Sequence, residues 1–87
     1  MSVIDAMREK LANLEPVSIE IIDDSAKHAG HAGAMSGGGH FRLRIVSPRF
    51  AGLKTMGRHR LVYDALGPLM KREIHALGIT AKTPEET

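Results

Sequence analysis

The segment His40–Ser47 alternates between polar and apolar side chains as far as Ile45, and this alternation constrains the fold more than any other feature. Its apolar residues fall on one side and its arginines on the other, in the order Phe41, Arg42, Leu43, Arg44 and Ile45. Successive side chains of a β-strand point to opposite faces of the sheet, so a period of two predicts a strand with one buried face. The chain therefore needs a sheet with one face covered by other elements.

Two other segments alternate in the same way and predict further strands. Val17–Asp23 and Ile74–Lys82 each carry three apolar residues on one face, which are Val17, Ile19 and Ile21 in the first and Leu77, Ile79 and Ala81 in the second. The strands at Val17–Asp23 and His40–Ser47 are expected to be antiparallel neighbours. A long connection of about residues 24–39, rich in glycine, alanine and histidine, joins them, and long connections are often functional.

Residues 2–14 and 53–73 have helical periodicity instead. The first stripe is capped by Ser2, ends before Pro16 and contains Ile4, Met7, Leu11 and Leu14; the second contains Val62, Leu66, Leu69 and Met70. Gly67 and Pro68 are predicted to break or bend the second helix, because proline lacks a backbone donor. Thr83 and Pro84 predict a last helical turn. The order helix, strand, strand, helix, strand predicts a single α+β domain over residues 1–87.

The composition favours a protein of the reducing cytoplasm that binds a partner and is not an enzyme. The 87 residues include no cysteine, which excludes disulfides and thiol catalysis by this chain alone. The first residues lack the pattern of a signal peptide, and no apolar run approaches the length of a membrane span. Neither a Ser–His–Asp arrangement nor a His-Glu-x-x-His motif is found, so nothing in the sequence supports catalysis.

Five histidines are the conspicuous chemical groups, and three of them are candidate metal ligands. His28 and His31 lie in the long connection, and His75 opens the last predicted strand. A zinc site held by one chain needs three or four fixed ligands, whereas histidine can replace cysteine at one iron of a 2Fe–2S cluster. A single histidine is more often a solvated or structural side chain than a ligand, and this is the role expected for His40 and His59.

Charge is distributed unevenly along the chain. From Arg42 to Arg60 there are six basic residues and no acid, while the first 24 residues carry six acids and two bases. This basic segment (residues 42–60) is either a solvated face or a surface for an anionic partner. If that partner is nucleic acid, the candidate phosphate contacts are Arg49, Lys54, Arg58 and Arg60.

Several blocks of the sequence, taken in order, resemble the BolA family. The blocks are Asp23-Asp24-Ser25 followed by His28, then His40-Phe41-Arg42-Leu43-Arg44-Ile45-Val46-Ser47, Arg49-Phe50-x-Gly52, Arg58-His59-Arg60-Leu61-Val62-Tyr63, Ile74-His75-Ala76-Leu77 and Thr83-Pro84-Glu85. They occur in the family's order and cover nearly the whole chain. Each block is short, but the ordered set is specific.

The resemblance implies the family's αββαβ fold, which is similar to the class II K-homology fold. It also implies a monothiol glutaredoxin of the Cys-Gly-Phe-Ser type as partner, which together with glutathione supplies sulfur ligands to a bridging 2Fe–2S cluster. The family's C-terminal ligand falls on His75, and its loop ligand falls on His28, with His31 as the alternative. Some members are associated with transcriptional regulation, so DNA binding through the basic segment is the second functional hypothesis.

Overall fold

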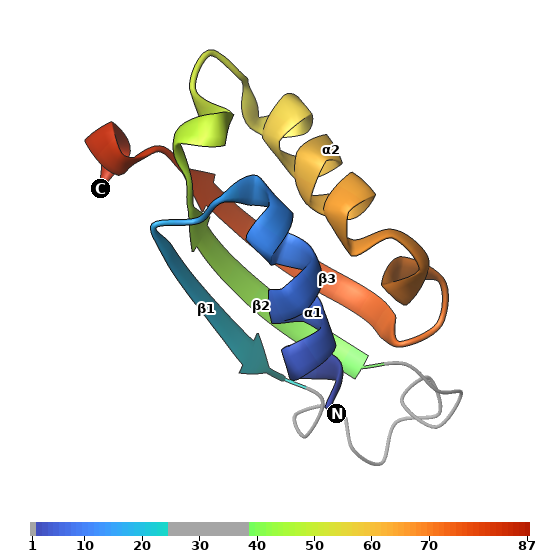
Figure 1. Cartoon of the computed structure of the whole chain (residues 1–87). Coiled ribbons are helices and arrows are strands. Elements are labelled where there is room, and N and C mark those ends of the chain that lie inside the picture. The colour runs from blue at the N-terminus through green and yellow to red at the C-terminus, as the bar shows by residue number, and fades with distance from the viewer. Residues whose placement is uncertain (1, 25–38) are drawn as a thin grey trace.

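A computed structural model describes residues 2–24 and 39–87, in which two helices pack on one face of a three-stranded sheet (Figure 1). Helix α1 (Val3–Leu11) continues into a 3-10 turn, η1 (Ala12–Leu14), and helix α2 (Thr55–Leu66) continues into η5 (Gly67–Lys71). The strands are β1 (Ser18–Asp23), β2 (Gly39–Val46) and β3 (Ile74–Lys82). The predicted order of helices and strands is confirmed.

The central strand of the sheet is β2, and the spatial order is β1-β2-β3. Strands β1 and β2 are antiparallel, as predicted, with Ile19 opposite Ile45 and Ile21 opposite Leu43. Strands β2 and β3 are parallel, so the chain between them must cross from one end of the sheet to the other. Helix α2 makes this crossing and covers the sheet on the same side as α1 (Figure 1).

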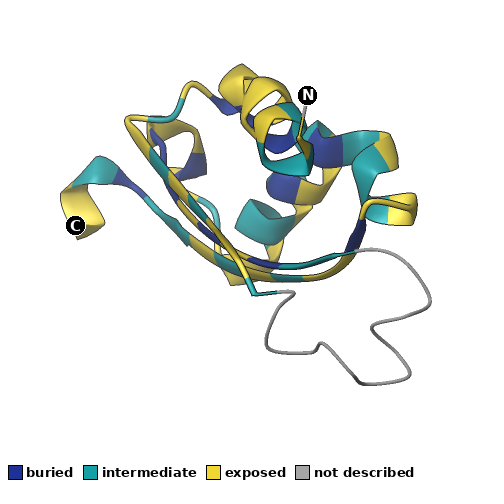
Figure 2. Cartoon of the chain, turned by 90° about the horizontal axis from the view of Figure 1, so that it is seen from below, coloured by how far each residue is buried: buried dark blue, intermediate teal, exposed yellow. Residues whose placement is uncertain are grey.

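The core lies between the helices and the covered face of the sheet (Figure 2). Its buried side chains are Met7, Leu11, Leu14, Phe41, Leu43, Ile45, Phe50, Val62, Leu66 and Ile74. The predicted inward faces of the second and third strands are confirmed, but Val17 is a wrong prediction because its side chain is 68% exposed. The strand begins one residue later, at Ser18, and Val17 lines a hollow together with Glu20 on the open face of the sheet.

Local interactions define where the helices begin and end. Ser2 caps α1 in a reciprocal capping box, since its hydroxyl accepts from the Asp5 amide at 3.1 Å and Asp5 accepts from the Ser2 amide at 3.5 Å. Helix α2 ends at Leu66 because Gly67 has φ +53 and Pro68 follows it, which confirms the predicted break. Neither helix in the described part of the chain is long and apolar enough to cross a membrane.

Candidate metal-ligand site

Strand β3 begins with an irregularity that determines where His75 points. Gly39 pairs with Ile74 and His40 pairs with Ala76, so β3 has one residue more than β2 at this point. Such a β-bulge allows Ile74 and Leu77, three residues apart, both to face the core. His75 lies between them and is exposed at the start of an edge strand.

The imidazole of His40 lies beside that of His75. The ring centroids are 5.1 Å apart and the ring planes are tilted by 46°, which is within the range of ordinary contacts between aromatic rings. His40 is half-buried on the central strand, and His75 is exposed on its neighbour. Of these two histidines, the sequence analysis predicted a ligand role only for His75, and the structure adds His40 as its contact.

The ends of the long connection are tied to the same end of the sheet. The Asp24 amide donates to the His40 carbonyl at 2.7 Å, and the Gly39 amide donates to the Glu73 carbonyl at 2.9 Å. Both attachments lie within two residues of His40 or His75. The other two predicted ligands, His28 and His31, lie outside the described residues.

The described residues do not form a complete metal site around His75. Within residues 2–24 and 39–87, no cluster of three or more His, Asp or Glu side chains is placed to hold a metal ion. An exposed imidazole can nevertheless serve as one ligand of iron in a 2Fe–2S cluster. Any metal bound by His75 would therefore need at least some of its ligands from outside the described residues.

His59 provides a natural comparison for His75. It follows Arg58 near the start of α2, and the Arg58 guanidinium donates to the carbonyl of Ala81, close to the end of β3. The first half of α2 thus lies at the end of the sheet where β3 finishes, opposite the end where β3 starts (Figure 1). His59 lines a hollow on the outer side of α2 with Met56 and Tyr63. The structure does not bring it to the site of His75.

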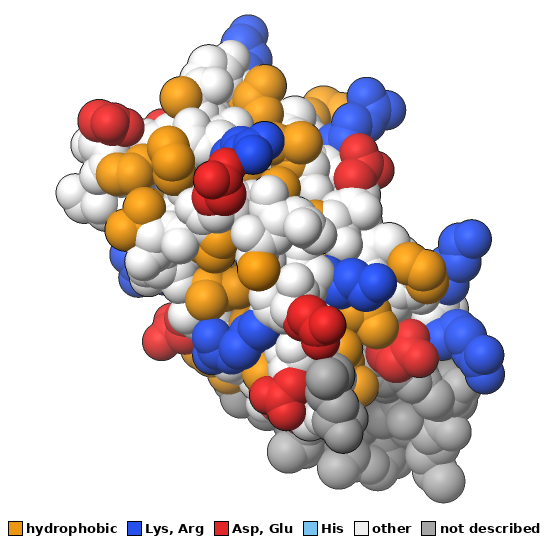
Figure 3. Space-filling model, in the orientation of Figure 1, with side chains coloured by type: hydrophobic (Ala, Val, Ile, Leu, Met, Phe, Trp, Pro, Cys, Tyr) orange, Lys and Arg blue, Asp and Glu red, His pale blue; other side chains and the backbone are white. Residues whose placement is uncertain are grey.

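The basic segment is free of acids only in the sequence. In the fold, carboxylates from other segments form ion pairs with its arginines. The distances from guanidinium nitrogen to carboxylate oxygen are 2.7 Å for Arg42–Asp24, 2.6 Å for Arg49–Glu15 and 2.6 Å for Arg58–Glu86. Glu20 also lies opposite Arg44 in the pairing of β1 with β2. Basic and acidic side chains are also interspersed on the helix-bearing face of the molecule, which Figure 3 shows.

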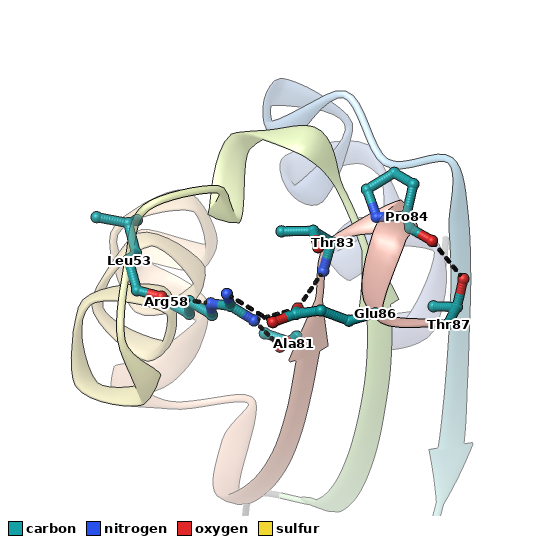
Figure 4. Close-up of polar contacts among 7 residues, drawn as sticks. All are labelled: Leu53, Arg58, Ala81, Thr83, Pro84, Glu86 and Thr87. Carbon is teal, nitrogen blue, oxygen red and sulfur yellow. Dashed lines mark hydrogen bonds and ion pairs between the residues drawn. The ribbon is translucent and has the colours of Figure 1, made fainter.

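Arg58 holds the C-terminal turn η6 (Pro84–Glu86) against the start of α2 (Figure 4). Its guanidinium donates to both carboxylate oxygens of Glu86, at 2.6 and 3.1 Å, and to the carbonyls of Leu53 at 2.8 Å and Ala81 at 3.1 Å. The hydrogen bonds between Arg58 and Glu86 are the main cause that lowers the pKa of Glu86 to about 2, and they also raise the pKa of Arg58. Only 15% of the Arg58 side chain is exposed, so its role here is structural.

The other three predicted nucleic-acid contacts are more accessible. Lys54 and Arg60 are exposed, and neither forms an ion pair with the residues described. The pair between Arg49 and Glu15 is exposed on both sides, at 54% and 67% of the side chains, and such pairs contribute little free energy. Lys54, Arg60 and Arg49 therefore remain candidates for contact with an anion.

The family follows from comparison with known proteins. Residues 11–86 match the family described as BolA-like protein. The chain belongs to the BolA family. The solved structure of BolA1 from Arabidopsis thaliana superposes on it with a TM-score of 0.83 and 41% identity, covering 100% of this chain and 98% of that one. This likeness confirms the predicted α+β fold class.

Curated relatives place the BolA domain in proteins of different lengths and names. SufE-like protein 1, chloroplastic/mitochondrial, from Arabidopsis thaliana is 49% identical over 86 residues, covering 92% of this chain and 23% of that protein. Protein BOLA1, chloroplastic, from the same plant is also 49% identical over 86 residues, covering 93% of this chain and 53% of that protein. The DNA-binding transcriptional regulator BolA of Escherichia coli is 36% identical over 87 residues, covering 99% and 80%. This chain thus spans about a quarter of the length of SufE-like protein 1 and about half of the length of protein BOLA1.

Proposed function

We propose that this BolA-family chain binds a monothiol glutaredoxin of the Cys-Gly-Phe-Ser type and donates histidine ligands to a 2Fe–2S cluster shared by the two proteins. The observation that carries the proposal is the exposed His75 at the end of the sheet where both ends of the long connection are hydrogen-bonded. That connection contains His28 and His31 in the sequence. In this proposal the chain works in iron–sulfur cluster assembly, trafficking or iron regulation.

Each protein contributes a different type of ligand. This chain has no cysteine, so the thiolates come from the glutaredoxin and from glutathione, while His75 and a loop histidine supply imidazole. His28 is the proposed loop ligand and His31 is the alternative. A 2Fe–2S cluster, when bound, supplies iron and sulfide for transfer and a centre that accepts one electron. The chain itself performs no catalysis in this proposal, and its setting is the cytoplasm.

Visible circular dichroism of a co-expressed complex tests the proposal. The wild-type chain should purify with the glutaredoxin as a coloured heterodimer whose spectrum differs from that of the glutaredoxin homodimer. His75→Ala should weaken or alter this spectrum, and His59→Ala, at the opposite end of the sheet, should leave it unchanged. His28→Ala and His31→Ala then identify the loop ligand. An unchanged spectrum in the His75→Ala complex would overturn the proposal.

The name of the Escherichia coli relative, DNA-binding transcriptional regulator BolA, favours DNA-binding transcriptional regulation as a second candidate function. The supporting feature here is the basic segment, in which Arg49, Lys54 and Arg60 remain accessible. The carboxylates that approach Arg42, Arg44 and Arg58 weaken this candidate, because they reduce the positive potential toward phosphate. Binding of DNA should fall steeply as salt rises, and a flat salt response would contradict it.

A further inference from the structure

The geometry points to His40 as a positioning residue that fixes the orientation of the His75 imidazole. This inference rests on the proposed function, in which His75 is an iron ligand. His40 acts through its ring contact with His75 and does not itself bind the iron. The observations that carry it are the 5.1 Å separation of the ring centroids and the 46° tilt between the rings.

The two histidines differ in how firmly their strands hold them. His40 lies on the central strand, which is paired with β1 on one side and with β3 on the other. Its carbonyl also accepts the hydrogen bond from the Asp24 amide at 2.7 Å. His75 lies in the irregular first part of an edge strand and is exposed. The backbone of His40 is therefore the more rigid of the two, and its ring can serve as a fixed surface.

An exposed imidazole without a contact samples several rotamers and loses that freedom when it binds a metal. A neighbouring ring reduces this loss by holding the side chain in one orientation before the partner arrives. Groups that hold a metal ligand in its binding orientation commonly raise the affinity of the site for the metal. Because the bulge brings His75 to the side of His40, the fold supplies such a surface without using a second ligand.

Two variants separate ring contact from nitrogen chemistry. His40→Ala removes the ring, whereas His40→Phe keeps an aromatic ring but has no nitrogen to bind iron or donate a hydrogen bond. In the co-expressed complex, His40→Ala should change the visible circular dichroism and release the cluster to a chelator about two- to ten-fold faster, since a ring contact changes an equilibrium by about that factor. His40→Phe should keep the wild-type spectrum and rate.

A second measurement uses the chain without cluster or partner. Nuclear magnetic resonance at one fixed alkaline pH reports the ring-proton shifts and the χ1 coupling of His75. His40→Ala should move the shifts and average the coupling between rotamers, while His40→Phe should keep a single rotamer. Unaltered His75 signals in His40→Ala would overturn the inference. Loss of the wild-type spectrum in His40→Phe would also overturn it, because the nitrogen would then be required.

The outcomes distinguish this inference from the proposed function. If His75→Ala alters the spectrum of the complex and His40→Ala does not, the positioning role of His40 is wrong and the cluster proposal stands. If His75→Ala leaves the spectrum unchanged, the cluster proposal fails whatever His40 does. Cooperative thermal unfolding of His40→Phe shows that the variant is folded before either result is used.

Discussion

The guanidinium of Arg58 and the carboxylate of Glu86 form two hydrogen bonds across 28 residues of sequence, with Nη1–Oε1 at 2.6 Å and Nη2–Oε2 at 3.1 Å. The same carboxylate accepts from the Thr83 amide at 2.7 Å, which completes the capping box of the C-terminal turn. Arg58 also reaches Ala81 on β3. This contact joins the start of α2, the end of β3 and the C-terminal turn.

The contribution of this contact to stability should depend on pH in the acid range. The hydrogen bond from Arg58 is the main cause of the lowered pKa of Glu86, about 2 instead of 4.5, and the Thr83 amide is the next cause. A carboxyl whose pKa is lowered in the folded state stabilises that state fully above its ordinary pKa. The stabilisation should therefore be present above pH 4.5 and be lost as the pH falls toward 2.

Urea unfolding of the wild type and of Glu86→Gln, at steps from about pH 6 to about pH 2, measures this effect. The gap between the two midpoints should be constant above pH 4.5 and close progressively below it. Because other carboxylates titrate in both proteins, the gap isolates Glu86. The exposed neighbour Glu85, as Glu85→Gln, is the control and should follow the wild type. A gap of equal size at both ends of the range contradicts the prediction.

Ser47 should be among the residues least tolerant of truncation. Its side chain is fully buried, and the hydroxyl donates to the Leu14 carbonyl at 2.5 Å and accepts from the Arg49 amide at 3.1 Å. It thus links the end of η1 to the turn after β2. Ser47→Ala leaves a carbonyl and an amide without this partner and should cost about 1–3 kcal/mol in the free energy of unfolding.

Urea denaturation can compare this variant with Ser18→Ala, in which an exposed strand residue of the same type is truncated. Ser18→Ala should change the free energy of unfolding by no more than about 0.5 kcal/mol. Equal effects of the two substitutions would mean that the buried hydroxyl of Ser47 contributes nothing specific.

Most of the fold was predictable because its signals are local. The last strand was predicted with the bounds that it has, Ile74–Lys82, and the break at Gly67 was read from two adjacent residues. Val17 was misplaced because alternation marks a face of a strand but not the residue where the strand begins. The buried position of Ser47, after the end of β2, was likewise not visible in the pattern.

The site was predictable only in part, because it depends on contacts between distant segments. His75 was nominated as a ligand, but its contact with His40 requires both the parallel pairing of β2 with β3 and the bulge. One local signal was available, since Ile74 and Leu77 are apolar residues three apart within a strand. The carboxylate that binds Arg58 could not be foreseen, because Glu86 belongs to another end of the chain.

Any phosphate contact made by the basic segment should come from its accessible side chains. Each neutralised phosphate adds about 0.9 to the slope of log K against log salt concentration. Lys54→Gln, Arg60→Gln and Arg49→Gln should each reduce the slope by about that amount. Arg58→Gln should leave the slope unchanged, because its guanidinium is already bound by Glu86 and two carbonyls.

Fluorescence anisotropy of a labelled duplex across a salt series measures these slopes, with folding of each variant checked by far-ultraviolet circular dichroism. A reduced slope in folded Arg58→Gln would show that the contact with Glu86 opens to phosphate. Absence of binding by the wild type at moderate salt would contradict the DNA-binding candidate itself.

Deletion of Ala76 should remove the bulge while preserving the sheet. Without it, Ile74 still pairs with Gly39, His75 falls opposite His40, and Leu77 keeps its place opposite Phe41, so each apolar side chain stays on the core face. The variant should therefore unfold in one cooperative transition.

In the deletion variant the imidazoles of His40 and His75 would be direct cross-strand neighbours, and the visible circular dichroism of its glutaredoxin complex should differ from that of the wild type. Ala76→Ser, which keeps the bulge, is the matched control and should retain the wild-type spectrum. A deletion variant that fails to fold would contradict the register argument, and a wild-type spectrum in the folded variant would mean that the bulge does not orient His75.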